Sequence, residues 1–340
     1  MLGRRIVFTG PRRAEVQEFG VDPAAAGPGA VWIRTRYTLV SGGTEGSAFV
    51  DRTGDTVYPT GVGYAAVGEV IREGTDFPDA RLGQLVLSYS PHQDIARASG
   101  VCVPLPAGLD PAVAVFARLA SVAMTAVWVS GVELGDRVAV IGQGVVGNLC
   151  AQLFGLAGAD VIGIDRSPRR IALAQAMGIA HTVLATDDDQ VRRDVRSLTG
   201  GLGVQTAVEA VGNPALVLAA AGYTRRLGQI ILLGSPRGAL TADLTDLLNR
   251  VHLWEHGCLT LKGAHEWRFP VRDRSAEDPT AKHSLEDNTR LAFGLLAAGR
   301  LRATELRTHL AGPEAAQEVY TGVCDRQEDY LGVVFDWGGA

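Results

Sequence analysis

The sequence contains little cysteine, no long uninterrupted apolar segment and no excess of positive charge. Its four cysteines lie far apart and form no C-x-x-C pair, which favours reduced thiols in a cytoplasmic protein. Arg, Asp or Gly interrupts each apolar stretch before it reaches the length of a membrane span, and residues 1–16 lack a secretory apolar core. The net charge of −5 argues against nucleic acid or an anionic membrane as the partner. A small-molecule partner is the remaining expectation.

The 340 residues, 46% of them hydrophobic, suffice for two domains. Residues 1 to about 113 are rich in glycine and proline, with short β-like runs and no helical period. The following stretch alternates apolar strands with helical segments, a pattern typical of an α/β fold with a doubly wound parallel sheet. The predicted strands cover residues 137–141, 160–164, 180–184, 204–209, 227–233 and 258–262. A loop over 264–284, a helix over 284–298 and a strand over 330–335 are expected to follow.

The most informative motif is Val138 to Gly147, a short β-branched strand that runs into G-x-G-x-x-G. Gly142 permits a tight turn, Gly144 lets the backbone approach a pyrophosphate, and Gly147 allows close packing of helix on sheet. Val145 and Val146 open the predicted helix, whose N-terminus favours a dianion. The motif therefore predicts a dinucleotide site of the Rossmann type.

The end of the second strand indicates which dinucleotide binds. Asp165 is placed to accept hydrogen bonds from a ribose diol and to repel a 2′-phosphate, which favours NAD. Arg166, Arg169 and Arg170 follow directly, and arginines there could compensate a 2′-phosphate. NADP therefore stays open as an alternative.

The order of these parts resembles the medium-chain dehydrogenase/reductase superfamily, the alcohol dehydrogenase-like fold, over nearly the whole chain. The matching local motifs are Gly43-Thr44-Glu45, Thr125-Ala126, Glu209-Ala210-Val211-Gly212, Leu232-Leu233-Gly234 and Thr308-His309. The resemblance implies a Rossmann domain over 114–263 and a discontinuous, β-rich, GroES-like catalytic domain built from 1–113 and 264–340. It implies cofactor contacts at Thr125, Ala210, Val211, Gly212, Leu233 and Gly234. It also implies a homodimer formed through a sheet edge near 259–262.

The sequence departs from that family at the zinc ligands. Zinc-dependent members carry Cys-Gly-Thr-Asp, then Gly-His-Glu, then a Cys or Glu before the Rossmann unit. This chain has Gly42-Gly43-Thr44-Glu45, then Gly63-Tyr64-Ala65, then Ala117-Arg118-Leu119, and it lacks the four-cysteine structural lobe. We therefore expect no zinc. The one alternative is a substitute site built from His92, His265 or His283.

Without zinc, other groups must handle the substrate oxygen. The resemblance implies that Thr44 hydrogen-bonds this oxygen and relays its proton, and Tyr64 stands where a metal-binding histidine would point at the substrate. A phenol with a pKa near 10 suits a proton donor better than a base unless a cation lowers that value, and Lys262 or Arg118 is the candidate cation. The alternative for Tyr64 is a buried aromatic that fills the space left by zinc.

Three further residues are candidates near the site. Glu45 matches the family's acid beside the metal, but an arginine partner or a helix N-terminal charge is the favoured interpretation. Ser47 is expected to be a helix N-terminal hydroxyl. His265 lies where relatives re-enter the catalytic domain and could touch the substrate.

These features predict a zinc-independent NAD(P)-dependent oxidoreductase, with NAD preferred. The expected reaction is hydride transfer between nicotinamide and a small secondary alcohol, polyol or ketone. Reduction of an enone, as in quinone-type reductases, is the alternative chemistry. A nicotinamide-binding structural or regulatory protein without turnover is the alternative of another class.

Overall fold

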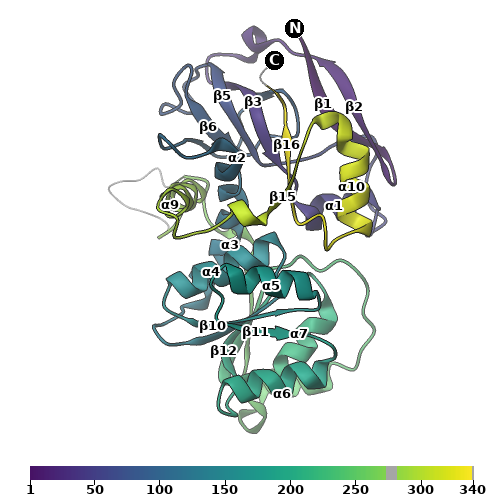
Figure 1. Cartoon of the computed structure of the whole chain (residues 1–340), viewed down its shortest axis with the longest axis vertical. Helices are drawn as coiled ribbons and strands as arrows, with labels where there is room; N and C mark the ends of the chain where they lie inside the picture. The colour runs from purple at the N-terminus through teal and green to yellow at the C-terminus, as the bar shows by residue number, and fades with distance from the viewer. Residues whose placement is uncertain (273–281, 339–340) are drawn as a thin grey trace. The chain divides into compact units, whose positions relative to one another are not determined.

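The computed structural model describes residues 1–272 and 282–338 and divides into two compact units (Figure 1). Unit 1 combines Met1–Ser121 with Phe269–Ala340, and unit 2 is Val122–Arg268. The predicted boundaries, after residues 113 and 263, fall a few residues earlier. The difference arises because helix α3 (Ala117–Ser130) starts in unit 1 and ends in unit 2, and because a short 3-10 helix, η3 (Glu266–Arg268), still belongs to unit 2.

Unit 2 is a doubly wound α/β domain, as predicted. Its six strands are all parallel and lie in the order β11-β10-β9-β12-β13-β14. The strands are β9 (Arg137–Ile141), β10 (Asp160–Asp165), β11 (His181–Leu184), β12 (Val204–Glu209), β13 (Thr224–Leu232) and β14 (Thr260–Gly263). Each predicted strand is present, because buried parallel strands read as continuous apolar runs. The start of β13 was predicted too late, because the exposed Arg225 and Arg226 hide it in the pattern.

Five helices alternate with these strands. They are α4 (Val145–Leu156), α5 (Pro168–Ala176), α6 (Asp188–Leu198), α7 (Pro214–Ala221) and α8 (Thr245–His252). The side chains of Ser167, Asp187 and Asn213 cap α5, α6 and α7 by accepting a backbone N–H group. Helix α4 differs, because its N-cap is Gly144 and no side chain caps it.

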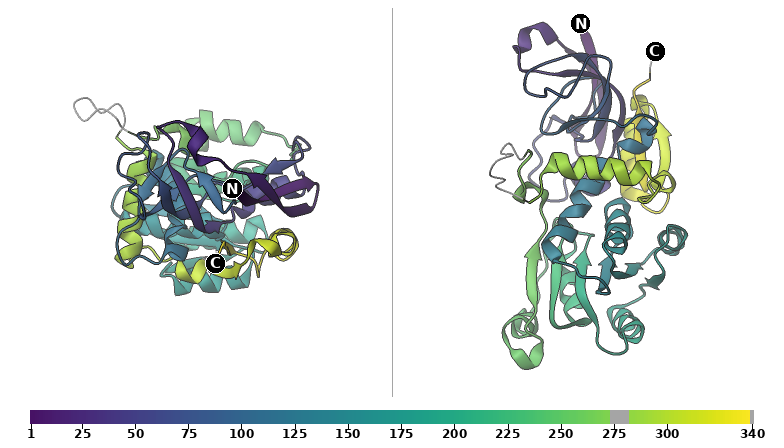
Figure 2. Two further views of the ribbon diagram at one scale, coloured as in Figure 1. Left: turned by 90° about the horizontal axis from the view of Figure 1, so that it is seen from above. Right: turned by 90° about the vertical axis from the view of Figure 1, so that its left-hand side faces the viewer.

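Unit 1 is rich in β structure and is made from both ends of the chain. Its larger sheet follows the order β15-β16-β3-β5-β6-β8, with β7 also paired to β3, and its smaller sheet is β2-β1-β4. The strands are β1 (Leu2–Gly10), β2 (Arg13–Gly20), β3 (Trp32–Leu39), β4 (Thr60–Gly61), β5 (Ala66–Arg72), β6 (Leu85–Ser88), β7 (Ile95–Arg97), β8 (Cys102–Pro104), β15 (Arg307–Ala311) and β16 (Gly332–Asp336). Because β16 pairs with β3, the yellow C-terminal segment lies beside the purple N-terminal strands (Figures 1 and 2).

The helices of unit 1 include one whose sequence shows no helical period. They are α1 (Gly42–Phe49), α2 (Pro111–Ala114), the start of α3, α9 (Leu285–Ala297) and α10 (Ala316–Asp325). Helix α1 contains three glycines and lacks a clear apolar period, and it begins at Gly42, earlier than the helix N-terminus expected near Ser47. Tertiary packing supports the helix, because Phe49 at its end belongs to the buried cluster that contains Tyr320 and Val323 of α10. Short 3-10 helices complete the described chain: η1 (Pro23–Ala26), η2 (Trp254–His256), η4 (Thr304–Leu306) and η5 (Pro313–Ala315).

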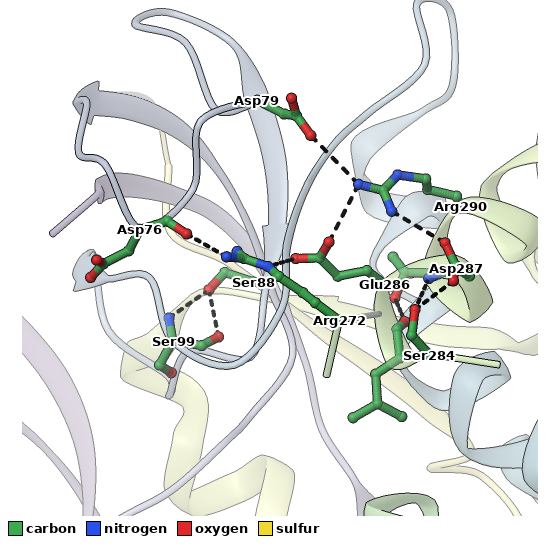
Figure 3. A network of polar contacts seen from close by, with 11 residues as sticks. Asp76, Asp79, Ser88, Ser99, Arg272, Ser284, Glu286, Asp287 and Arg290 are labelled. Atoms are coloured by element: carbon green, nitrogen blue, oxygen red, sulfur yellow. Dashed lines mark hydrogen bonds and ion pairs between the residues drawn. The ribbon is translucent and has the colours of Figure 1, made fainter. Parts of the chain in front are cut away.

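Ion pairs and hydrogen bonds attach the returning segment to the β-rich unit (Figure 3). Arg272 binds the Glu286 carboxylate at the start of α9 and donates to the carbonyl of Asp76 on the β5–β6 connection. Arg290 of α9 lies 3.7 Å from the Asp79 carboxylate. The guanidinium of Arg272 also lies 4.3 Å from the centre of the Phe77 ring. These contacts explain why 282–338 belongs to unit 1 despite its distance in the sequence.

Among residues 1–272 and 282–338, one helical stretch is long and apolar enough to cross a membrane by length and composition alone. It covers Pro111–Ser130, with a mean hydropathy of 1.9, so the expectation that no such stretch exists was wrong. However, 83% of its apolar window is buried within the protein, which accounts for its hydrophobic side chains without a membrane.

Candidate functional site

The glycine motif of unit 2 has the geometry expected of a dinucleotide loop. Gly142 has φ of +91°, a conformation that favours glycine, and its amide donates to the carbonyl of Ile164 at 2.7 Å. A Cβ on Gly147 would lie 1.8 Å from the carbonyl oxygen of Gly142, so only glycine fits there. Val145 and Val146 form the first turn of α4, where amide groups have no acceptor within the helix. Together these features form a backbone cradle that suits a pyrophosphate.

The other predicted cofactor loops meet this motif at the same edge of the sheet. A Cβ on Gly142 would lie 2.6 Å from the side chain of Val211, and one on Gly147 would lie 3.4 Å from Ala210. Glu209 binds the loop after β12, because its carboxylate accepts the amide groups of Val211 and Gly212.

The loop after β13 contacts the loop after β12. A Cβ on Gly234 would lie 2.2 Å from the amide nitrogen of Gly212, so glycine is required at this contact too. The amide of Leu233 donates to the carbonyl of Glu209 at 2.9 Å. The structure therefore brings the predicted cofactor residues of three loops together at the carboxyl edge of the sheet, where such folds bind dinucleotides.

Asp165 ends β10 and is mostly buried, with both carboxylate oxygens engaged. Oδ2 accepts the amide of Gln143 at 2.7 Å, and Oδ1 accepts the amide of Ser167 at 2.9 Å. Each oxygen keeps a second lone pair for a ribose hydroxyl. Arg170 lies 3.7 Å from Oδ2, whereas Arg166 is exposed. Asp165 therefore orients the glycine loop in addition to its predicted role.

Thr125, the remaining predicted cofactor residue, lies on the part of α3 that belongs to unit 2. Its side chain is fully buried, and its Oγ has no hydrogen-bond partner in the described chain. The side-chain amide nitrogen of Asn148 on α4 is likewise buried without a partner among described residues. Buried polar atoms without partners are costly, and a polar ligand would satisfy them. The residues of unit 2 thus fit a nicotinamide dinucleotide.

Tyr64 is the centre of a polar cluster in unit 1. Its hydroxyl donates to Oγ of the buried Ser41, the residue that precedes α1, and is also hydrogen-bonded to Thr44, which is exposed on α1. Burial raises the pKa of Tyr64 above its ordinary value of 10, and the charge of Arg118 opposes this rise without cancelling it. A phenol in this environment stays protonated at neutral pH and can donate a proton.

Arg118 is a cation beside Tyr64 within unit 1. The guanidinium carbon of Arg118 lies 4.7 Å from the centre of the Tyr64 ring. The ammonium of Lys262 donates to the carbonyl of Val129 within unit 2. Of the two cations predicted from the sequence, Arg118 therefore contacts Tyr64, and a role for Lys262 of unit 2 stays a prediction.

Glu45 lies behind this cluster and is fully buried. Its carboxylate binds Nε2 of His92 at 2.9 Å, the hydroxyl of Tyr320 at 2.6 Å and the amide of Ser41 at 2.9 Å. Burial opposes ionisation, but the charge of His92 and these hydrogen bonds outweigh it and lower the pKa of Glu45. The expected arginine partner was wrong, and the position of Glu45 in the first turn of α1 matches the other interpretation. A catalytic role for Glu45 stays a prediction, and the contacts indicate a structural carboxylate.

Both Ser41 and His92, which bind the Glu45 carboxylate, also adjoin Tyr64 or its neighbour Gly63. The ring of His92 packs against Gly63, where a Cβ would lie 2.5 Å from the ring. Gly63 has φ of +91° and directly precedes Tyr64. Glu45 therefore fixes Tyr64 from two sides, through Ser41 and through His92.

The positions that carry zinc ligands in relatives hold other groups here. Gly42 and Ala65 have no ligating side chain, Tyr64 is a protonated phenol, and a guanidinium occupies the third position at Arg118. In residues 1–272 and 282–338 no group of three His, Cys, Asp or Glu side chains could hold a metal ion. These residues do not fit a zinc ion.

The remaining candidates have other local surroundings. His265 is exposed in unit 2, where its Nδ1 accepts the amide of Trp267 at 3.4 Å. His283 is half-buried beside the ring of Phe269. Ser47 lies in the body of α1 and is buried, so its predicted place at a helix N-terminus was wrong. His265 as a substrate contact stays a prediction.

Sequence reasoning missed three residues around Tyr64, namely Ser41, Tyr89 and Tyr320. Ser41 carries a weak signal, since a hydroxyl before a helix with a glutamate inside its first turn resembles a capping box with one extra residue. Tyr89 and Tyr320 come from distant segments, and no spacing rule joins them to Tyr64.

Comparison with known proteins agrees with this fold. Residues 145–268 match the family described as zinc-binding dehydrogenase. D-guloside 3-dehydrogenase of Escherichia coli is 29% identical over 239 residues, which cover 62% of this chain and 67% of that protein. An Escherichia coli oxidoreductase/dehydrogenase of unknown specificity, involved in membrane biogenesis, has a TM-score of 0.81 at 16% identity over 99% of both chains. A putative zinc-binding dehydrogenase from Sinorhizobium meliloti, solved with NADP bound, has a TM-score of 0.80 at 18% identity over 99% of both chains.

The fold and the glycine loop define a Rossmann dinucleotide-binding unit with a second, β-rich unit. Residues 145–268 match the zinc-binding dehydrogenase family, and the chain is similar to medium-chain, alcohol dehydrogenase-like oxidoreductases. The family name describes its relatives and does not assign a metal to this chain.

Proposed function

We propose that this protein is a zinc-independent, NAD-preferring dehydrogenase that acts on a small secondary alcohol or polyol and the corresponding ketone. One observation carries the proposal. At the positions where relatives hold zinc, this chain has a protonated phenol, Tyr64, hydrogen-bonded to Ser41 and Thr44 and lying beside the cation of Arg118. A hydrogen-bond donor with a nearby cation can polarise a carbonyl oxygen, which is the task of the metal in relatives.

The role proposed for each side chain follows from the proton that the reaction adds to or removes from the substrate oxygen. Reduction of a ketone adds a hydride to carbon and a proton to oxygen, and oxidation removes both. When bound, the nicotinamide supplies or accepts the hydride. Tyr64 supplies the proton in the reductive direction, while Thr44 holds the substrate oxygen. In the oxidative direction the Tyr64 hydroxyl accepts the substrate proton while its own proton passes to the Ser41 hydroxyl, and Ser41 releases its original hydroxyl proton to solvent.

The preference for NAD rests on Asp165. A carboxylate at the end of the second strand repels a 2′-phosphate. Its ion pair with Arg170 partly offsets that charge, so NADP binding is the specific alternative. Measuring the affinity of all four nicotinamide cofactors decides between them.

Two other functions make different predictions. An enone reductase needs a donor for the enolate oxygen, which Tyr64 could also supply, so activity on conjugated double bonds but not on alcohols would favour it. A binding protein without turnover would bind the cofactor, show no activity with any substrate class, and not change on substitution of Tyr64.

The first experiment combines cofactor binding with one substitution. Thermal shift with NAD, NADH, NADP and NADPH on chelator-treated protein should show stabilisation by the NAD pair. Tyr64→Phe should keep this shift and lose about 10²- to 10⁴-fold in kcat, since general acid catalysis contributes that much. Tyr37→Phe, in strand β3 of the same unit, is the matched control and should keep full activity. Failure of all four cofactors to bind would refute the oxidoreductase mechanism.

We also propose a homodimer formed through strand β14. This strand is the terminal strand of the six-stranded sheet, and Leu261 on it is 40% exposed. An unpaired edge with an exposed leucine favours pairing with a second copy. Light scattering should give twice the chain mass, and Leu261→Lys should shift the protein toward monomer.

A further inference from the structure

Arg118 has an unusual environment for a cation in unit 1. It lies in the first turn of α3 and is 3% exposed. Its guanidinium carbon lies 4.7 Å from the centre of the Tyr64 ring and 3.9 Å from that of Tyr89. Its Nε also donates to the backbone carbonyl of Tyr64 at 3.3 Å. One side chain thus holds both the ring and the backbone of Tyr64.

Tyr89 in turn is held in place behind the guanidinium. It follows strand β6, and its carbonyl accepts the hydroxyl of Ser99 at 2.9 Å. Gly100, with φ of +62°, packs on its ring, where a Cβ would lie 3.2 Å away. The orientation of Arg118 is therefore set by the β-rich unit before any ligand binds.

We propose that Arg118 is a positioning residue, held by Tyr89, that fixes the Tyr64 phenol in its donating orientation and stabilises the negative charge that forms there as the proton leaves. This inference rests on the proposed function of Tyr64. It assigns to an arginine, acting through Tyr64, the electrostatic work that a metal does in relatives.

Two charges of opposite sign act on the phenol. Arg118 favours the ionised phenol, and Glu45 on α1 disfavours it, while Ser41 and Thr44 act through hydrogen bonds. Without the charge of Arg118, burial and the charge of Glu45 both favour the neutral phenol. The pKa of Tyr64 should then rise further, and proton donation should become harder.

A double-mutant cycle tests whether Arg118 acts through Tyr64. Arg118→Met should reduce kcat at least tenfold in the wild-type background and cause no further loss in the Tyr64→Phe background, with KM nearly unchanged. Arg118→Lys, which keeps the charge without the planar face, should restore part of kcat. Arg81→Met, on an exposed loop of the same unit, is the control and should leave kcat unchanged. Equal losses in both Tyr64 backgrounds would show a merely structural role and overturn the proposal.

A readout without turnover separates this inference from the proposed function. In protein labelled with 3-fluorotyrosine, the ¹⁹F resonance missing from Tyr64→Phe identifies residue 64, and its titration reports the phenol directly. Arg118→Met should move the midpoint to higher pH, and Arg118→Lys should move it back. An unchanged midpoint would refute the inference even if the enzyme is active. A shifted midpoint in a protein without turnover would support the inference while the proposed function fails. If Arg118→Met does not fold, Tyr89→Leu removes the support of the guanidinium and should shift the midpoint in the same direction.

Discussion

Replacing Gly147 by alanine should abolish tight cofactor binding while leaving unit 2 folded. The added Cβ would lie 1.8 Å from the carbonyl oxygen of Gly142, whereas ordinary contact begins at 3.4 Å, so α4 and the glycine loop must separate by more than an ångström. Overpacking of this kind costs about 1–3 kcal/mol of stability. A displacement of about 1 Å at a positioned site can cost ~10²-fold, which is the expected rise in Kd.

Gly155, in the same helix, provides the matched control. A Cβ there meets nothing within 4 Å, and the residue is exposed. Gly155→Ala should therefore keep the wild-type Kd and gain up to about 1 kcal/mol from helix propensity. Isothermal titration with NADH and thermal unfolding measure both quantities. Equal Kd values for Gly147→Ala and the wild type would refute the assignment of this loop to the dinucleotide.

The other predictions concern unit 1 and the thiols. Glu45→Ala leaves the buried His92 and Tyr320 without their partner and should lower the free energy of unfolding by about 3–5 kcal/mol, measured in urea, whereas Glu328→Ala on the surface should change little. Because the pKa of Glu45 is lowered on folding, its contribution is present above the ordinary value of 4.5 and is lost as pH falls through the folded pKa. The acid-side loss of stability should therefore be shallower in Glu45→Gln, and an unchanged slope would contradict this. Burial raises the pKa of Cys102 to about 12 and also raises that of the fully buried Cys150, so neither should react with a thiol reagent at pH 8 until the protein unfolds. Fast labelling of either in the native state, detected by mass spectrometry of the peptides, would show that its surroundings open.

The fold of unit 2 was predictable because its signals are local. Apolar runs mark the parallel strands, and Gly142, Gly144 and Gly147 mark the turn between strand and helix. Unit 1 was harder to predict. Helix α1 has no clear apolar period, and its Phe49 packs in the buried cluster of Tyr320 and Val323 of α10, a contact between distant residues that no periodicity can show. The resemblance to a family, rather than any pattern, indicated that the C-terminal segment returns to this unit.

The cofactor residues of the candidate site were likewise easier to predict than the residues around Tyr64. The cofactor loops could be found from glycines and from Asp165, since each follows a strand of one sheet. Tyr64 was found only because it stands where relatives carry a ligand. The contacts that define its environment come from Ser41, Tyr89 and Arg118, which no sequence spacing connects.

The most direct test of a metal-free dehydrogenase is the turnover of metal-depleted protein. Protein dialysed against chelator, with its zinc content measured, is assayed for NADH formation with secondary alcohols and polyols, and for NADH consumption with the matching ketones. We predict turnover at zinc contents far below one ion per chain, no increase on adding zinc, and loss of turnover in Tyr64→Phe. Activity that appears only when zinc is restored would contradict the account.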